Sequence, residues 1–160
     1  LGDVYKRQGD YDAYTMLTLT VDHVTTSGIT WMRQFVGVLF FWVPRAIWKN
    51  KPVGSGYFVA DQLGWTFKNL SCPLPGEAYI NLGVIGVLLG GILIGKIMRF
   101  LDNCYWYRDK EDDRRIDVVY PVTMMMFFFM CRGDLLSSAA YMVAYIVVGY
   151  IMSYVYRVDK

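Results

Sequence analysis

The sequence predicts an all-α, polytopic integral membrane protein fragment with about three transmembrane helices and an outer-face loop region that carries interfacial helices. Two observations lead to this fold class. Hydrophobic residues make up 55% of the 160 residues and aromatic residues 17%, and the mean hydropathy is +0.29. The apolar residues also form long runs, whereas a soluble strand or helix spaces them at a period of about 2 or about 3.6 residues.

The clearest predicted span is Ala78–Met98. At a rise of about 1.5 Å per residue it measures about 31 Å, which matches one hydrocarbon core. Gly86–Gly90 and Gly91–Gly95 have the GxxxG spacing that lets helices approach closely. We expect these glycines to pack within the molecule rather than to form a dimer.

Two further apolar runs predict spans at 118–131 and 135–156. The first run measures only about 21 Å, but flanking arginines can extend it by reaching toward the head groups. These arginines are Arg114, Arg115 and Arg132. The second run is uncharged and long enough to cross the bilayer.

Loop cations set the predicted orientation, because cytoplasmic loops are rich in Lys and Arg. Segment 99–117 is predicted as a cytoplasmic connector and 157–160 as a cytoplasmic tail. Segment 9–77 then lies on the outer face, periplasmic or extracellular. An anionic ligand is one reason for cations on the outer face, where the charge rule does not expect them. The cations of this segment are Arg33, Arg45, Lys49, Lys51 and Lys68.

Within the outer segment, Gly9–Gly28 predicts a weakly amphipathic helix that Gly28 ends. Phe35–Pro44 is apolar but too short to span, so we predict an interfacial or re-entrant helix that ends at Pro44. Lys49–Gly76 is rich in Pro and Gly and predicts a functional loop. Three tryptophans are expected at head-group depth: Trp31, Trp42 and Trp48.

Several ligand and protein classes are not expected. A net charge of +2 gives no basis for nucleic acid binding. The three cysteines lack CxxC spacing and His23 is the single histidine, so neither a disulfide framework nor a metal site is predicted. Residues 1–8 resemble a translated sequencing-adaptor tail, and on that interpretation the true chain is truncated upstream.

Four stretches of the sequence, in their order and spacing, resemble one family of bacterial membrane enzymes. They are GDYDAY at 9–14, PRAIWKNKPVGSGYFVA at 44–60, NLSCPLPGEAYINLGVIGVLLGGILIGKIMR at 69–99 and FFFMCRGDLL at 127–136. Together they resemble the C-terminal half of the O-antigen and oligosaccharide repeat-unit polymerases (Wzy-type). Some members carry outer loops with an arginine, ten residues and then a glycine, which is the spacing of Arg45 and Gly56.

The resemblance implies a multi-pass, metal-independent glycosyltransferase of the bacterial inner membrane, with a cytoplasmic C-terminus and no cofactor. Its substrate would be an undecaprenyl-pyrophosphate-linked oligosaccharide, polymerised into O-antigen or into capsular polysaccharide or exopolysaccharide. The lipid bilayer and a chain-length regulator protein are the other expected partners. The upstream half of the family fold is missing, so the fragment alone is expected to be inactive.

The reaction breaks a glycosyl–phosphate bond, so cations must stabilise the departing pyrophosphate and a base must take the acceptor proton. We predict as catalytic residues Arg45, Glu77 and His23. We predict as binders of pyrophosphate or sugar Arg45, Lys49, Lys51, Gly56, Arg132 and Trp48.

Simpler interpretations stay open for each residue. The loop cations can form a basic rim that interacts with bulk lipid phosphates. The tryptophans can form an interfacial belt. His23 can be a packed histidine, and Arg132 can pair with Asp134. The Glu77 carboxylate can interact with the positive N-terminal end of a helix dipole. Rival functions are a flippase for lipid-linked oligosaccharides, an O-antigen ligase and a non-catalytic membrane subunit of polysaccharide assembly.

Overall fold

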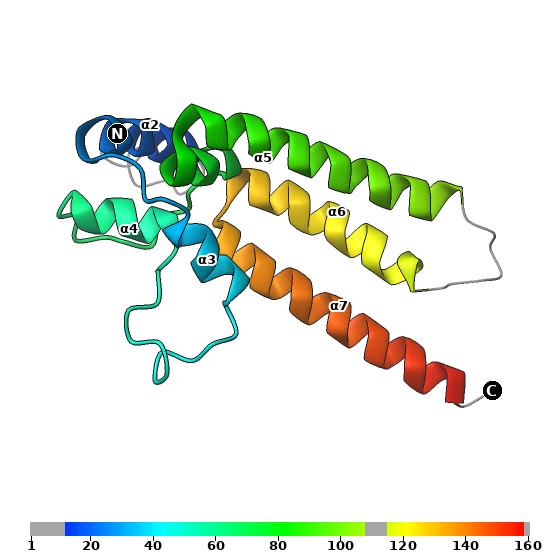
Figure 1. Cartoon of the computed structure of the whole chain (residues 1–160). Helices are drawn as coiled ribbons and strands as arrows, with labels where there is room; N and C mark the ends of the chain where they lie inside the picture. The colour runs from blue at the N-terminus through cyan, green and yellow to red at the C-terminus, as the bar shows by residue number, and fades with distance from the viewer. Residues whose placement is uncertain (1–11, 108–114, 159–160) are drawn as a thin grey trace, which may run out of the picture.

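The computed structural model describes residues 12–107 and 115–158, and all regular secondary structure in these residues is helical. Three long helices form an elongated bundle, and three shorter helices gather at one end of it (Figure 1). The all-α prediction is therefore confirmed for the described residues. The helices are α2 (Asp12–Ser27), α3 (Arg33–Leu39), α4 (Ser55–Gln62), α5 (Leu74–Trp106), α6 (Ile116–Arg132) and α7 (Leu135–Val158).

Two of the described helices, α5 and α7, are long and apolar enough to cross a membrane. The core helix of a soluble protein would be mostly buried, but only 17% and 6% of the residues in their apolar windows are buried. Helix α6 corresponds to the predicted span 118–131 and packs against both neighbours, but its 17 residues rise only about 25 Å. The wide apolar exposure is what lipid contact requires.

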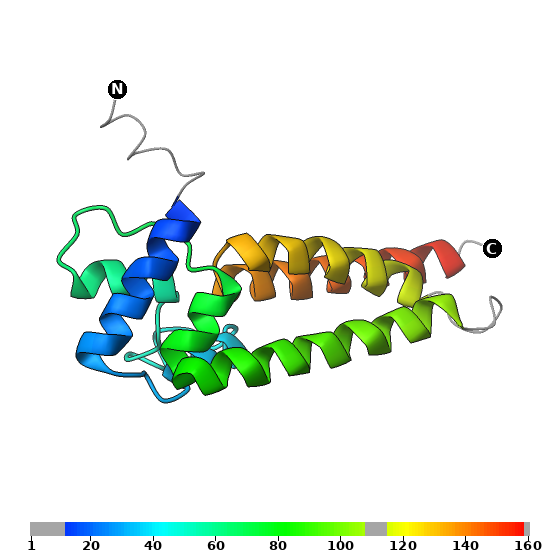
Figure 2. The same cartoon turned by 90° about the horizontal axis from the view of Figure 1, so that it is seen from above.

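The short helices lie at one end of the bundle only (Figures 1 and 2). Helix α5 runs away from the short helices, α6 returns and α7 runs away again. The turn between α6 and α7 therefore lies beside the short helices, and the end of α5, the start of α6 and the end of α7 lie at the far end. Residues 1–11, 108–114 and 159–160, which include much of the predicted connector and tail, lie outside the described part of the chain.

Helix α5 differs from the straight span predicted at 78–98. It begins earlier, ends later and is broken at Gly83, where φ is 64° and ψ is −149°. This backbone conformation is essentially restricted to glycine. The break separates a short arm, 74–82, from a segment, 84–106, whose length of about 34 Å is enough for the whole bilayer crossing. Large exposed apolar side chains of α5 begin at Val84, so the arm lies outside the exposed apolar part of the helix.

The break in α5 holds α3 in place. The Ile80 carbonyl accepts a hydrogen bond from the Thr30 N–H at 2.8 Å. The Asn81 Oδ1 atom accepts from the N–H groups of Gln34 at 3.2 Å and Phe35 at 3.4 Å, which are free at the start of α3. Asn81 is completely buried, so a side chain from α5 caps α3. The approach to α3 is tight, with positive φ at two non-glycine residues, Trp31 and Met32.

The short helices share a small core with the α5 arm. Met16 on α2, Val59 on α4 and Ile80 on the arm are almost fully buried together. Burial of each such side chain contributes about 1.5–3 kcal/mol. The prediction of a continuous loop at 49–76 is therefore wrong, because α4 lies within it. A helix of 8 residues bounded by glycines is too short for its periodicity to stand out.

The other two outer predictions have different outcomes. Helix α2 ends at Ser27, and Gly28 follows with φ of +85° and donates to the Val24 carbonyl at 3.0 Å, so the predicted stop is confirmed. Helix α3 ends at Leu39 rather than at Pro44. It stops early because residues 40–43 form turns whose carbonyls face Lys51, as described next.

Candidate functional site

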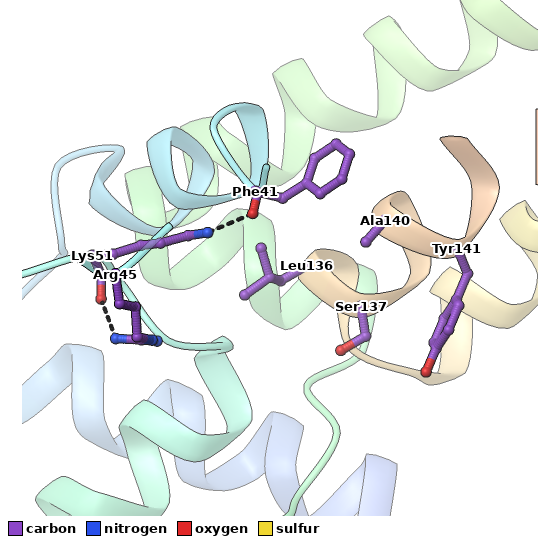
Figure 3. A pocket seen from close by; sticks show the side chains of 7 residues that line it. All are labelled: Phe41, Arg45, Lys51, Leu136, Ser137, Ala140 and Tyr141. Atoms are coloured by element: carbon purple, nitrogen blue, oxygen red, sulfur yellow. Dashed lines mark hydrogen bonds between the residues drawn. The ribbon is translucent and has the colours of Figure 1, made fainter. Parts of the chain in front are cut away.

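A pocket of about 370 Å³ lies between the loop that follows α3 and the first turns of α7 (Figure 3). It lies at the end of the bundle that holds the short helices. Two predicted cations, Arg45 and Lys51, line the loop wall, and two hydroxyl side chains line the α7 wall. The lining residues are Phe41, Arg45, Lys51, Leu136, Ser137, Ala140 and Tyr141. The pocket therefore combines positive charge, hydroxyl groups and apolar surface.

The two cations also hold the loop together (Figure 3). The Lys51 ammonium donates hydrogen bonds to the Phe41 carbonyl and, at 3.0 Å, to the Val43 carbonyl. Arg45 Nη1 donates to the Lys51 carbonyl at 3.2 Å. Each cation has further N–H groups beyond these bonds. Lys51 is half-buried and Arg45 is exposed, so Arg45 is the more accessible cation for a ligand.

Asp134 organises the opposite wall. One of its carboxylate oxygens, Oδ2, accepts hydrogen bonds from the Ser137 N–H at 3.0 Å and from the Ser137 hydroxyl at 2.8 Å. The N–H bond is that of a helix N-cap, because Ser137 is the third residue of α7. The hydroxyl bond fixes Ser137 Oγ at the pocket surface with its proton directed toward Asp134.

A second carboxyl group, Glu77, lies behind Asp134. Glu77 is 1% exposed and accepts hydrogen bonds from the Ser55 hydroxyl and, at 3.4 Å, from the Leu135 N–H. The pKa of Glu77 is raised to about 8, mainly by burial and in part by the charge of Asp134 and a hydrogen bond with it, while hydrogen bonds from Ser55 and Leu135 act in the lowering direction. Glu77 is therefore protonated at neutral pH.

The other oxygen of Asp134, Oδ1, is enclosed. It lies where a Cβ atom on Gly54 would approach to 2.5 Å, so a larger residue at position 54 would displace the Asp134 carboxylate. Oδ1 is buried and has no hydrogen-bond partner in the described residues. Glu77 is protonated at neutral pH and can therefore donate a hydrogen bond to Asp134.

The remaining predicted residues lie outside the pocket wall. His23 is 7% exposed and packs edge-on against Phe58, with ring centroids 5.5 Å apart, which is the packed-histidine interpretation. Trp48 is half-buried and packs edge-on against Phe40, with ring centroids 6.4 Å apart. Lys49 on the loop and Arg132 at the end of α6 are exposed.

Gly56, the glycine of the predicted arginine–glycine pair, serves packing. A Cβ atom there would lie 2.0 Å from the Leu70 carbonyl oxygen, so α4 can approach the chain at Leu70 only because residue 56 is glycine. Arg45 and Gly56 therefore have different roles, one at the pocket and the other in the core beside it. The spacing between them does not bring them to one ligand site.

Sequence reasoning missed the α7 side of the pocket, which consists of Leu136, Ser137, Ala140 and Tyr141. One signal was present. Asp134 and Ser137 have the spacing of an N-cap and the third helical residue, and Ser137 and Tyr141 are one turn apart on an otherwise apolar helix. Polar side chains on one face of an apolar helix indicate a polar neighbour or a cavity.

Comparison with known proteins gives no relative for this chain: no family model, no curated protein and no solved structure matches it. In the described parts of the chain, no group of three or more His, Cys, Asp or Glu side chains is arranged to hold a metal ion.

Proposed function

We propose that the protein polymerises undecaprenyl-pyrophosphate-linked oligosaccharide repeat units by glycosyl transfer, and that the pocket between the loop and α7 holds the lipid pyrophosphate. The observation that carries this proposal is the pairing of two cations on one wall with two hydroxyls on the other, over apolar surface. An amphiphilic substrate with a pyrophosphate and a sugar requires these three surfaces.

The two walls suit the two reacting groups. Negative charge develops on the pyrophosphate as the glycosyl–phosphate bond breaks, and Arg45 and Lys51 supply fixed positive charge on that wall. Arginine can donate two hydrogen bonds to phosphate oxygens, so Arg45 is the principal residue that binds the pyrophosphate. The acceptor sugar then lies against Ser137 and Tyr141, where hydroxyl groups can orient its own hydroxyls.

The arrangement of the helices supports a membrane location for this reaction. We propose that α5, α6 and α7 cross the inner membrane of a bacterium, with α6 as the short third span. The pocket then opens at the outer face and the C-terminus lies in the cytoplasm, as loop charge predicts. A chain-length regulator protein remains a proposed partner.

Chain growth tests the proposal directly. The full-length protein is reconstituted in liposomes with synthetic undecaprenyl-pyrophosphate repeat units, and the products are separated by length. Wild type should give a ladder, whereas Arg45→Ala should leave single repeat units. Arg33→Ala is the matched control, because Arg33 is an exposed arginine in the same region that does not line the pocket. A normal ladder from Arg45→Ala would contradict the role of Arg45.

A flippase for the same lipid is the second candidate, and the break at Gly83 favours it, since broken helices mark many transporter sites. Such breaks lie near the middle of the bilayer in transporters, whereas here a full span follows the break. Movement of a fluorescent lipid-linked sugar across the liposome membrane without any ladder would favour the flippase.

A further inference from the structure

Ser137 joins the pocket to the two buried carboxyl groups. Its hydroxyl lines the pocket and donates to Asp134 Oδ2 at 2.8 Å, and Asp134 in turn adjoins the protonated Glu77. A hydrogen-bonded path therefore leads from the acceptor side of the pocket to an enclosed carboxylate. No carboxyl side chain of the described residues lines this pocket, and Asp134 accepts a hydrogen bond from Ser137, which does line it.

We propose that Ser137 and Asp134 form the proton relay that deprotonates the acceptor hydroxyl, with Asp134 as the proton acceptor acting through Ser137. The proposal rests on the proposed function and names the base for that reaction. Ser137 would contact the acceptor sugar, whereas Asp134 positions Ser137 and receives the proton without touching the substrate.

The step balances in atoms and charge. The acceptor oxygen forms a bond to the anomeric carbon, and the bond between that carbon and the phosphate oxygen breaks, with its electron pair leaving on the pyrophosphate. The acceptor proton moves to Ser137 Oγ while the Ser137 proton moves to Asp134 Oδ2. Release of the proton from Asp134 to water then restores the site.

Glu77 adds no second negative charge beside Asp134 at neutral pH. Glu77 is 1% exposed and its pKa is raised to about 8, so its carboxyl holds a proton. The N–H of Ser137 donates to Asp134 Oδ2 at 3.0 Å. Other titratable groups near the pair are Cys72 and, across the pocket, Arg45 and Lys51.

The simpler interpretation is that Asp134 only caps α7. Asparagine caps helices as well as aspartate does but accepts no proton, so Asp134→Asn separates the two roles. Ser137→Ala removes the hydroxyl link and leaves the backbone cap, and Ser137→Thr restores a hydroxyl at the same position. The thermal midpoint of Asp134→Asn should stay close to that of wild type.

The experiment measures kcat, KM and the pH dependence of chain growth in liposomes with the full-length protein and synthetic lipid-linked repeat units. Asp134→Asn should lower kcat about 100-fold, with KM within about twofold, because general base catalysis contributes about 10²–10⁴-fold. Ser137→Ala should lower kcat about tenfold or more, and Ser137→Thr should restore most of it.

The outcomes separate the relay from the polymerase. Wild-type rates in both Asp134→Asn and Ser137→Ala would overturn the relay and leave the polymerase proposal standing. A loss in Ser137→Ala that Ser137→Thr does not restore would also overturn the relay. No ladder from wild type would overturn the relay together with the proposed function.

Discussion

Glu77 predicts an unusual dependence of stability on pH. Its pKa is about 8 in the folded protein against an ordinary value of 4.5, because the carboxyl is buried beside Asp134. Between these two values the folded state holds a proton that the unfolded state releases. The stability supplied by this proton is complete below about pH 4.5 and is lost as the pH rises through about 8.

The magnitude follows from the size of the shift. Each pH unit in this window lowers the free energy of unfolding by up to about 1.4 kcal/mol, and the whole window corresponds to about 5 kcal/mol. Glu77→Gln removes this dependence, because an amide stays neutral and can still accept from Ser55 and donate to Asp134. Glu77→Gln should therefore be as stable as wild type near pH 5 and more stable near pH 8, with a thermal midpoint higher by about 10 °C.

Tryptophan fluorescence reports the thermal midpoint of the full-length protein in detergent across this pH range. Asp22→Asn is the control, because Asp22 is an exposed carboxylate on α2 and its replacement should leave the pH dependence unchanged. Parallel pH curves for wild type and Glu77→Gln would refute the assignment of a buried, protonated Glu77. A Glu77→Gln protein that loses stability relative to wild type as the pH rises would refute it as well.

Two glycine substitutions test the fold around the pocket. Gly83→Ala should lower the free energy of unfolding by about 1–3 kcal/mol, because alanine is strained at a φ of 64°. The control Gly91→Ala should be neutral or stabilising, because nothing lies within 4 Å of the added Cβ. Equal effects of the two substitutions in denaturation experiments would contradict the break in α5. Gly56→Ala should lower the free energy of unfolding by about 3 kcal/mol or more, because the added Cβ would lie 2.0 Å from the Leu70 carbonyl oxygen. An unchanged thermal midpoint would show that α4 does not pack there.

The long helices could be predicted because their signal is local. An apolar run of about 20 residues has few alternatives to a spanning helix, so the positions of α5 and α7 follow from composition. The break at Gly83 has no such signal, because the sequence there is one glycine among several in an apolar helix. What makes the break stable is remote in sequence: Thr30, Gln34 and Phe35 bond to the groups that the break exposes.

The pocket could be predicted only on one side. Arg45 and Lys51 stand out in the sequence because cations are costly beside an apolar run and therefore demand an explanation. Ser137 and Tyr141 are ordinary residues of an apolar helix, and only the fold brings them opposite the cations. Glu77, predicted as a catalytic residue, is buried behind Asp134 and does not line the pocket.

Lys51 and Arg45 differ in how much of their bonding holds the loop together. Its ammonium bonds to the carbonyls of Phe41 and Val43, so its replacement would disturb the loop whether or not it binds a ligand. Arg45 makes a single bond, at 3.2 Å, to the Lys51 carbonyl and keeps other donors for a phosphate. Arg45 is therefore the residue on which ligand binding can be measured with little loss of structure.

The central claim is that this pocket holds a lipid pyrophosphate. The most direct test is to measure how tightly the full-length protein binds undecaprenyl pyrophosphate in nanodiscs. Loss of one charge-assisted contact, about 1.5–3 kcal/mol, predicts that Arg45→Gln binds about 10- to 100-fold more weakly, with Arg33→Gln equal to wild type. Equal affinities for wild type, Arg45→Gln and Arg33→Gln would contradict the claim and show that the pyrophosphate binds elsewhere.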